Sequence, residues 1–196
     1  MIIALVSDKG GVGKTTCSVH IAHLLNRVKP ALLVDDDRNR SSLAWSRRGS
    51  LAFKVIPEKQ AAMHARNFEN IVIDTGARMD REGLKEIAEG CDQLIVVTGC
   101  DMLSIDALLS GAAELKEMGG DKLKVLLNAV PPVGNAGSDA RAFLSEMGLP
   151  VLNCMIRRFA AYGKAALQGV TVDQVSDPYA LEAWSDFEKL GKELRI

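Results

Sequence analysis

The sequence predicts an α/β fold in which a mainly parallel, twisted sheet carries helices on both faces. Short apolar runs alternate with amphipathic stretches along the 196 residues. Several of these runs are apolar at nearly every position, as in "IIALV", "LIVV" and "KVLL", which is typical of strands buried on both faces of a parallel sheet. A glycine-rich stretch, "DKGGVGKTT", follows the first run and precedes a helical pattern. Together these three observations favour a nucleotide-binding α/β fold.

The elements follow a strand–helix rhythm with no internal repeat and no linker, so we expect one domain over residues 1–196. Strands are expected at Ile2–Ser7, Ala31–Asp35, Phe53–Ile56, Ile71–Asp74, Gln93–Thr98, Lys124–Ala129 and Val151–Cys154. Helices are expected at Lys14–Arg27, Ser41–Arg47, Glu58–Arg66, Arg81–Glu89, Ser104–Met118, Asp139–Met147, Ala160–Gln168 and Pro178–Leu194. Ligands of such sheets bind beyond the carboxyl ends of the strands, and the polar stretches "DDDRN", "DTGAR" and "NAVPP" lie there.

Composition restricts the function further. The formal net charge is −1, so nucleic-acid binding would require a local basic patch rather than bulk charge. No stretch approaches the roughly 20 apolar residues that span a bilayer, and no basic segment precedes the first apolar run, so we expect a cytoplasmic protein. The four cysteines form no CxxC pair and are expected to be small buried hydrophobes: Cys17, Cys91, Cys100 and Cys154.

The stretch from residue 8 to residue 16 has the pattern of a phosphate-binding loop, although Asp8 stands where the first glycine is usual. In such loops backbone N–H groups and a helix N-terminus hold phosphate oxygens, so Gly11 and Gly13 leave room for the phosphates. Lys14 would bridge the β- and γ-phosphates, while Thr15 would ligate Mg²⁺. The expected nucleotide contacts in the loop are Lys9, Gly10, Gly11, Val12, Gly13, Lys14, Thr15 and Thr16.

"KGGVGKTT" resembles the deviant Walker A box of the ParA/MinD ATPases, and the resemblance extends over essentially the whole chain. "LLVDDDRN" is similar to the family's D-x-D-P-Q motif, "NIVIDTGA" to its Walker B segment, and "MIRRFAAYGKAALQGVTV" to its late G-x-x-V stretch. The resemblance implies a P-loop NTPase fold and Mg²⁺-dependent hydrolysis of ATP to ADP and phosphate. It also implies an ATP-dependent homodimer that works with an adaptor protein to position cargo, plasmid DNA or a protein organelle such as the carboxysome, on non-specific nucleoid DNA.

The same resemblance assigns a role to Lys9, which would reach across the dimer to the nucleotide of the other subunit. A cation donated in trans would offset the negative charge of two facing ATP molecules. The alternative is an exposed lysine at the edge of a loop.

The aspartates at the strand ends receive roles by the same match, while the roles of Gly76 and Asn128 rest on the missing Cβ of the first and the paired donor and acceptor of the second. Asp37 would position the attacking water, which makes Lys9, Lys14 and Asp37 the expected catalytic residues, although the "DDD" run could also be a solvated turn. Asp35 and Asp74 would hold Mg²⁺ through water, together with Thr15. Gly76 would offer its N–H to the γ-phosphate. Asn128 would contact adenine, or else be a turn asparagine at the end of its strand.

Three questions stay open at this stage. Lys189, Lys192 and Arg195 recur at a spacing of three and could form a DNA-binding stripe on the last helix, or a solvated face. A MinD-like membrane-associated ATPase is the alternative function, since Leu181, Trp184, Phe187, Leu190 and Leu194 give this segment an apolar side. We expect the segment to pack on the sheet and membrane binding to be absent. His20 and His23 are expected to pack or lie on the surface rather than bind metal.

Overall fold

The computed structural model describes residues 1–196, and all seven expected strands form one sheet. The strands are β1 (Ile2–Val6), β2 (Ala31–Asp36), β3 (Lys54–Pro57), β4 (Asn70–Thr75), β5 (Gln93–Thr98), β6 (Leu123–Val130) and β7 (Val151–Arg157). Their order across the sheet is β3-β2-β4-β1-β5-β6-β7, and every neighbouring pair is parallel. The predicted parallel α/β sheet is therefore confirmed.

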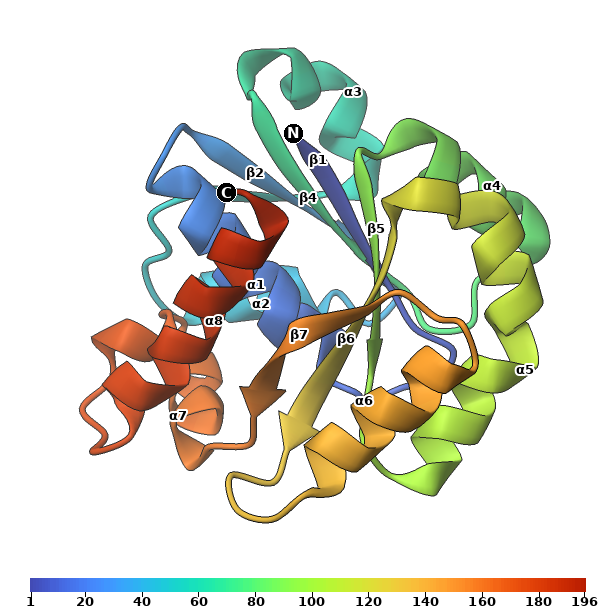
Figure 1. Ribbon diagram of the computed structural model, residues 1–196. Coiled ribbons are helices and arrows are strands. Elements are labelled where there is room, and N and C mark those ends of the chain that lie inside the picture. The colour runs from blue at the N-terminus through green and yellow to red at the C-terminus, as the bar shows by residue number, and fades with distance from the viewer.

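Helices cover both faces of the sheet, as Figure 1 shows. They are α1 (Lys14–Asn26), α2 (Ser41–Arg48), α3 (Ala61–His64), α4 (Arg81–Gly90), α5 (Met102–Gly119), α6 (Ala136–Glu146), α7 (Ala160–Gln168) and α8 (Ala180–Leu194). Residues of α1, α2, α7 and α8 pack in one hydrophobic core, and residues of α4, α5 and α6 pack in another on the opposite face. Adjacent residues of β1 divide between them, with Ile3 and Leu5 in the first core and Ala4 and Val6 in the second. This division explains why the strand is apolar at every position.

One expected helix is wrong as a continuous element. Residues 58–66 form a short 3₁₀ turn, the four-residue α3 and a second 3₁₀ turn, rather than one helix. None of these pieces buries a residue, so no packed face stabilises a longer helix. The other helices differ from the predictions only near their ends, α6 beginning at Ala136 and α5 at Met102.

The topology places the phosphate-binding loop at the centre of one edge of the sheet. β1 lies between β4 and β5, and the loop leaves its carboxyl end. The segments after β2 and β4 leave the same edge, because all of these strands run in one direction. Ligand sites of open parallel sheets lie where the strand order reverses in this way.

Candidate functional site

The loop between β1 and α1 has the backbone shape that its glycines allow. Gly11 and Gly13 adopt positive φ angles of 79° and 91°, and Gly13 immediately precedes α1. A Cβ atom on Gly13 would lie 2.1 Å from the Asn128 side-chain nitrogen, so only glycine fits there. The loop therefore presents the N-terminus of α1 toward a cavity, an arrangement that suits an anion.

Asn128, at the end of β6, supports this loop from behind. Its side chain is buried, and its Nδ2 donates a hydrogen bond to the Val12 carbonyl at 2.6 Å. Asn128 does not line the phosphate cavity described next. Its observed contact is thus structural, and the adenine contact stays a prediction.

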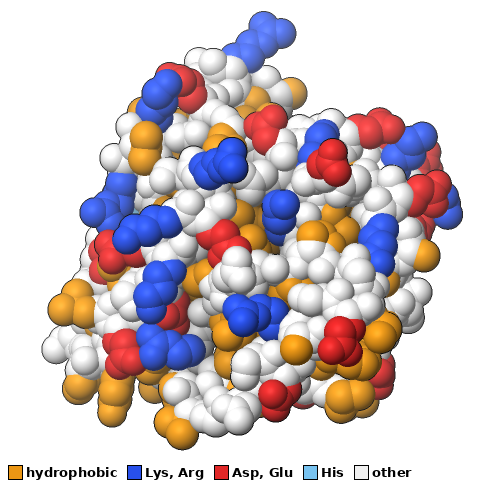
Figure 2. Space-filling model, viewed as in Figure 1, with side chains coloured by type: hydrophobic (Ala, Val, Ile, Leu, Met, Phe, Trp, Pro, Cys, Tyr) orange, Lys and Arg blue, Asp and Glu red, His pale blue; other side chains and the backbone are white.

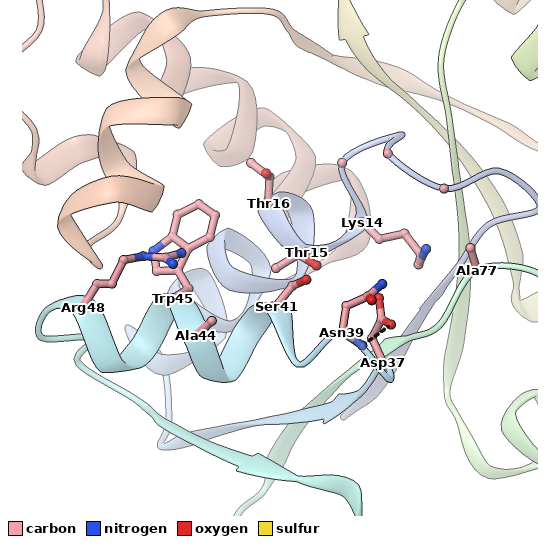
Figure 3. A pocket seen from close by; sticks show the side chains of 13 residues that line it. Lys14, Thr15, Thr16, Asp37, Asn39, Ser41, Ala44, Trp45, Arg48 and Ala77 are labelled. Carbon is pink, nitrogen blue, oxygen red and sulfur yellow. Dashed lines mark hydrogen bonds between the residues drawn. The ribbon is translucent and has the colours of Figure 1, made fainter.

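A cavity of about 470 Å³ opens in front of the loop. Figure 3 shows Lys14 and Asp37 at one end of it, Thr15 and Ser41 in the middle, and Trp45 and Arg48 at the far end. The complete lining is Gly10, Gly11, Gly13, Lys14, Thr15, Thr16, Asp37, Asn39, Ser41, Ala44, Trp45, Arg48 and Ala77. Most of the expected nucleotide contacts of the loop therefore surround one space.

Lys14 is the buried cation of this cavity. Only 7% of the residue is exposed, and its Nζ donates a hydrogen bond to Ser7 Oγ at 2.7 Å. Burial lowers its pKa, an effect that Asp74, Asp37 and Asp8 oppose. A cation that has lost part of its hydration is stabilised by a bound phosphate, which fits the role predicted for Lys14.

Asp74 is the residue before the last one of β4 and is completely buried. Ser18 Oγ and Ser42 Oγ donate hydrogen bonds to its two carboxylate oxygens, at 3.0 and 2.6 Å. Burial raises its pKa, while hydrogen bonds from Ser42, Thr15 and Ser18 oppose the rise. Thr15 lines the phosphate cavity and its hydroxyl donates a hydrogen bond to the Asp74 carboxylate behind it. Mg²⁺ typically uses one or two protein oxygen ligands with waters and phosphates. These residues fit a magnesium site of that kind.

Asp35 supports the backbone of the segment that leads into α2. It is fully buried, and its Oδ1 and Oδ2 accept hydrogen bonds from the backbone N–H groups of Asp37 at 3.1 Å and Leu43 at 2.9 Å. Both oxygens thus hold the segment that leads into α2, and Asp35 does not line the cavity. Asp74 also lies outside the lining, but it accepts a hydrogen bond from Thr15, which belongs to the lining. We therefore use Thr15 and Asp74 in the proposal below, and the water-mediated metal role of Asp35 stays a prediction.

Asp37 lies in the cavity, and its Oδ1 accepts a hydrogen bond from the Asn39 N–H at 2.9 Å. Asp35 and Asp37 thus form two turns in which a side chain accepts from the N–H two residues later. Asp36, which lies between them, lines a neighbouring cavity of about 520 Å³ that it shares with Gly76. Asp37 is the carboxylate of this run that the structure places beside Lys14.

Gly76 lies in the segment between β4 and α4. A Cβ atom there would meet only the Asp36 carbonyl, at 3.9 Å, so the protein itself does not require glycine at this position. Ala77, the next residue, lines both cavities. The contact of the Gly76 N–H with a γ-phosphate stays a prediction.

Lys9 points away from the phosphate cavity. Its Nζ donates to Asp101 Oδ1 at 3.3 Å and to Ser104 Oγ at 3.1 Å, at the N-terminus of α5. The side chain is 39% exposed and does not line the cavity. Lys9 is therefore not placed to bind a nucleotide held by its own Lys14.

His20 packs beneath the phosphate loop. Of the two expected positions, packed or on the surface, the structure shows the first. His20 is fully buried: Nδ1 donates to the Thr16 carbonyl at 2.7 Å, and Nε2 accepts from the Val172 N–H at 2.9 Å. Burial lowers its pKa to about 4. Its ring lies 4.7 Å from that of Phe187, so the neutral imidazole connects α1 to the C-terminal part of the chain.

The cysteine prediction is confirmed for Cys17 and Cys91, which are buried, whereas Cys100 and Cys154 are partly exposed. The serines that hold Lys14 and Asp74, namely Ser7, Ser18 and Ser42, were not predicted. Serine is too common for its position to indicate a role, and only the spacing of Ser18 four residues after Lys14 on one helix could have indicated it.

The last helix packs on the fold as expected. Trp184, Phe187, Leu190 and Leu194 are buried, but Leu181 is 76% exposed and does not belong to the apolar side. The Arg157 guanidinium donates to Asp186 at 2.9 Å, which ties α8 to β7. No helix combines the length and the apolar character needed to cross a bilayer.

The predicted basic stripe is shorter than its spacing implied. α8 ends at Leu194, and Arg195 adopts a left-handed conformation with φ 60°, so it does not continue the helical face. The Lys189 Nζ lies 3.7 Å from the Asp186 carboxylate. Figure 2 shows basic side chains interspersed with acidic ones on the face that carries α8, rather than a patch of one sign.

Comparison with known proteins agrees with this geometry. Residues 3–172 match the family model described as "CobQ/CobB/MinD/ParA nucleotide binding domain". The chain is 31% identical to "Maintenance of carboxysome distribution protein A" of Gloeobacter kilaueensis over 202 residues, which cover 98% of this chain and 93% of that protein. An ATP complex of McdA from Cyanothece is similar in structure, with a TM-score of 0.75, 16% identity, and coverage of 100% of this chain and 96% of that one. The cell division protein MinD of Aquifex aeolicus is also similar in structure, with a TM-score of 0.71 and 17% identity, and the match covers 97% of this chain and 96% of that one. The chain belongs to the CobQ/CobB/MinD/ParA family of nucleotide-binding proteins.

Proposed function

We propose that this protein is a Mg²⁺-dependent ATPase that dimerises on ATP and, with an adaptor protein, distributes a protein organelle such as the carboxysome on nucleoid DNA in the cytoplasm. The observation that supports this choice of cargo is the similarity, over 98% of the chain, to a relative described as maintaining carboxysome distribution. Plasmid DNA is the other cargo that the family resemblance allows. The relative favours the protein organelle.

Binding of ATP follows from the cavity. Lys14 and the N–H groups of the loop would hold the β- and γ-phosphates, because they are the cation and the donors that surround the space. Thr15, and Asp74 through water, would hold Mg²⁺, which supplies positive charge to the phosphates when bound. The Asp37 carboxylate lines the cavity together with Lys14 and would orient the attacking water by accepting a hydrogen bond from it.

The proposed dimer depends on Lys9. Its side chain is 39% exposed and donates hydrogen bonds to the exposed Asp101 carboxylate and to the buried Ser104 hydroxyl, and a phosphate of a second subunit would replace these partners. In the dimer, Lys9 would offset the charge of the partner's nucleotide.

The Asp37→Ala variant tests the proposed chemistry. We expect it to bind ATP and dimerise, and to hydrolyse ATP about 100-fold more slowly, because only the orientation of the water is lost. Phosphate release with Mg²⁺ and equilibrium binding of a fluorescent ATP analogue measure the two steps. Asp36→Ala is the matched control, since Asp36 does not line the phosphate cavity. Full turnover by Asp37→Ala together with loss of turnover by Asp36→Ala would move the role to Asp36.

DNA and membrane binding are tested separately. We expect the ATP-bound dimer to bind DNA without sequence preference and to lose affinity steeply with salt. A mobility shift with a non-hydrolysable ATP analogue at two salt concentrations measures this affinity. Dimers that never shift DNA at low salt would exclude the DNA scaffold but not the ATPase activity.

Because the apolar side of α8 is buried, we expect no flotation with liposomes, and flotation would instead support the MinD-like alternative.

A further inference from the structure

Arg78, between β4 and α4, has a strained backbone. Its φ angle is 56°, and it is one of four residues other than glycine with a positive φ. A side chain in this conformation costs about 1 kcal/mol, whereas glycine adopts it freely. An outlier of this kind beside an active site is a reason to ask what its side chain does.

Arg78 makes two hydrogen bonds to the start of the phosphate loop. Its backbone N–H donates to the Ser7 carbonyl at 3.0 Å, and its Nε donates to the Asp8 carbonyl at 3.2 Å. The Ser7 hydroxyl accepts from Lys14 and donates to the Lys9 carbonyl. Arg78 therefore binds Ser7, which positions Lys14, and the next residue, Asp8.

Charge gives a second reason for an arginine here. Asp8 occupies the usual position of a glycine, and its Oδ2 is buried without a hydrogen-bond partner. Burial and the nearby Glu114 raise its pKa, whereas Arg78 and Lys14 oppose the rise. A carboxylate at the start of a phosphate loop repels the ligand, and the Arg78 guanidinium offsets this charge.

The segment between β4 and α4, which Arg78 holds, borders the phosphate cavity. Arg78 lines the cavity of about 520 Å³ together with Gly76, Ala77 and Asp37, and Asp37 and Ala77 also line the phosphate cavity. The backbone of Gly76 and Ala77 is thus positioned by a residue that is itself attached to the phosphate loop.

We propose that Arg78 is a positioning residue for ATP hydrolysis: it latches the segment after β4 to the phosphate loop and so aligns Gly76 and Ala77 with the γ-phosphate. This inference rests on the ATPase activity proposed above. The latch itself exists without nucleotide, so it has a test that does not depend on that activity.

Two variants separate the latch from the backbone strain. Arg78→Gln keeps the strained conformation and loses the guanidinium, while Arg78→Gly loses both. Both should bind the ATP analogue within threefold of wild type and hydrolyse ATP about tenfold more slowly, with the loss in kcat rather than KM. In the protein without nucleotide, amides of residues 76–80 should exchange with deuterium about tenfold faster in both variants, because one hydrogen bond of the latch is lost.

Arg81→Gln is the matched control. It removes a guanidinium from the first residue of α4, where Arg81 pairs with Glu114 and Glu117 on α5 and does not touch the loop. It should leave exchange at residues 76–80 and kcat unchanged. Thermal melts confirm that all three variants fold.

The outcomes are decisive in each direction. Unchanged exchange in both Arg78 variants would overturn the latch, even if kcat fell. Faster exchange with unchanged kcat would overturn its role in hydrolysis. If the wild type bound no ATP or hydrolysed none, the proposed function would fail, while the exchange measurement would still decide whether the latch exists.

Discussion

Lys9 and Lys14 lie five residues apart on one loop, but their surroundings are opposite. Lys14 is 7% exposed and bonded to Ser7 inside a cavity, whereas the Lys9 side chain is 39% exposed and bonded to Asp101 on the surface. The inner lysine is preorganised for a ligand of its own chain, because its position is fixed and it is partly desolvated. The outer lysine is held by contacts that water can replace. The contrast indicates one lysine for binding and one for assembly.

The largest effect is expected at the inner lysine. Lys14→Ala should weaken ATP binding by more than about 100-fold, because the phosphates lose a charge-assisted bond in a cavity that excludes part of the water. Titration with a fluorescent ATP analogue measures it. Lys29→Ala is the control, since Lys29 is an exposed lysine that pairs with Glu69 on the surface. An affinity within threefold of wild type would contradict the assignment of the loop.

The scaffold under the inner lysine should be sensitive to acid. Burial lowers the pKa of His20 to about 4, from 6.5 in the unfolded chain, so the native state favours the neutral ring. The resulting stability is present above pH 6.5 and is lost as the pH falls toward 4. Between pH 7.5 and pH 5, we expect a loss of about 2 kcal/mol in the free energy of unfolding from this group.

Urea unfolding at the two pH values measures this loss. His20→Gln should remove about 2 kcal/mol of the pH dependence, whereas His64→Gln, at a half-buried histidine beside Lys54, should leave it unchanged. An equal pH dependence in wild type and His20→Gln would show that another group causes it.

Sequence alone predicted the strands and the phosphate loop because their signals are local. A strand buried on both faces must be apolar throughout, and a loop around phosphate needs glycine at fixed positions. The surroundings of Asp35 and Asp74 could not be distinguished in this way, since both are aspartates near the ends of buried strands. Backbone N–H groups surround the first and serine hydroxyls the second. The contact of Lys9 with Asp101 joins residues 92 positions apart and has no local signal.

The smallest effect is expected where Lys9 is held in the monomer. Asp101 also caps α5 by accepting from the Ser104 N–H at 3.1 Å, so Asp101→Asn keeps the cap and removes the charge. Freed of an exposed ion pair, Lys9 should favour the ATP-dependent dimer by about two- to fivefold. Sedimentation equilibrium with a non-hydrolysable ATP analogue measures the dimer. A dimer weakened by Asp101→Asn would indicate that Asp101 serves the assembled state instead.

The most direct test of the difference between the two lysines is the dimerisation of Lys9→Ala. Light scattering with and without a non-hydrolysable ATP analogue measures it. The account predicts ATP affinity close to wild type, because Lys14 and the loop remain, and an ATP-dependent dimer weakened by one to three orders of magnitude, which is about 1.4–4 kcal/mol. Lys85→Ala, at an exposed lysine of α4, should dimerise normally. If Lys9→Ala formed the ATP-dependent dimer as readily as wild type, Lys9 would be a surface lysine and its role across the dimer would be wrong.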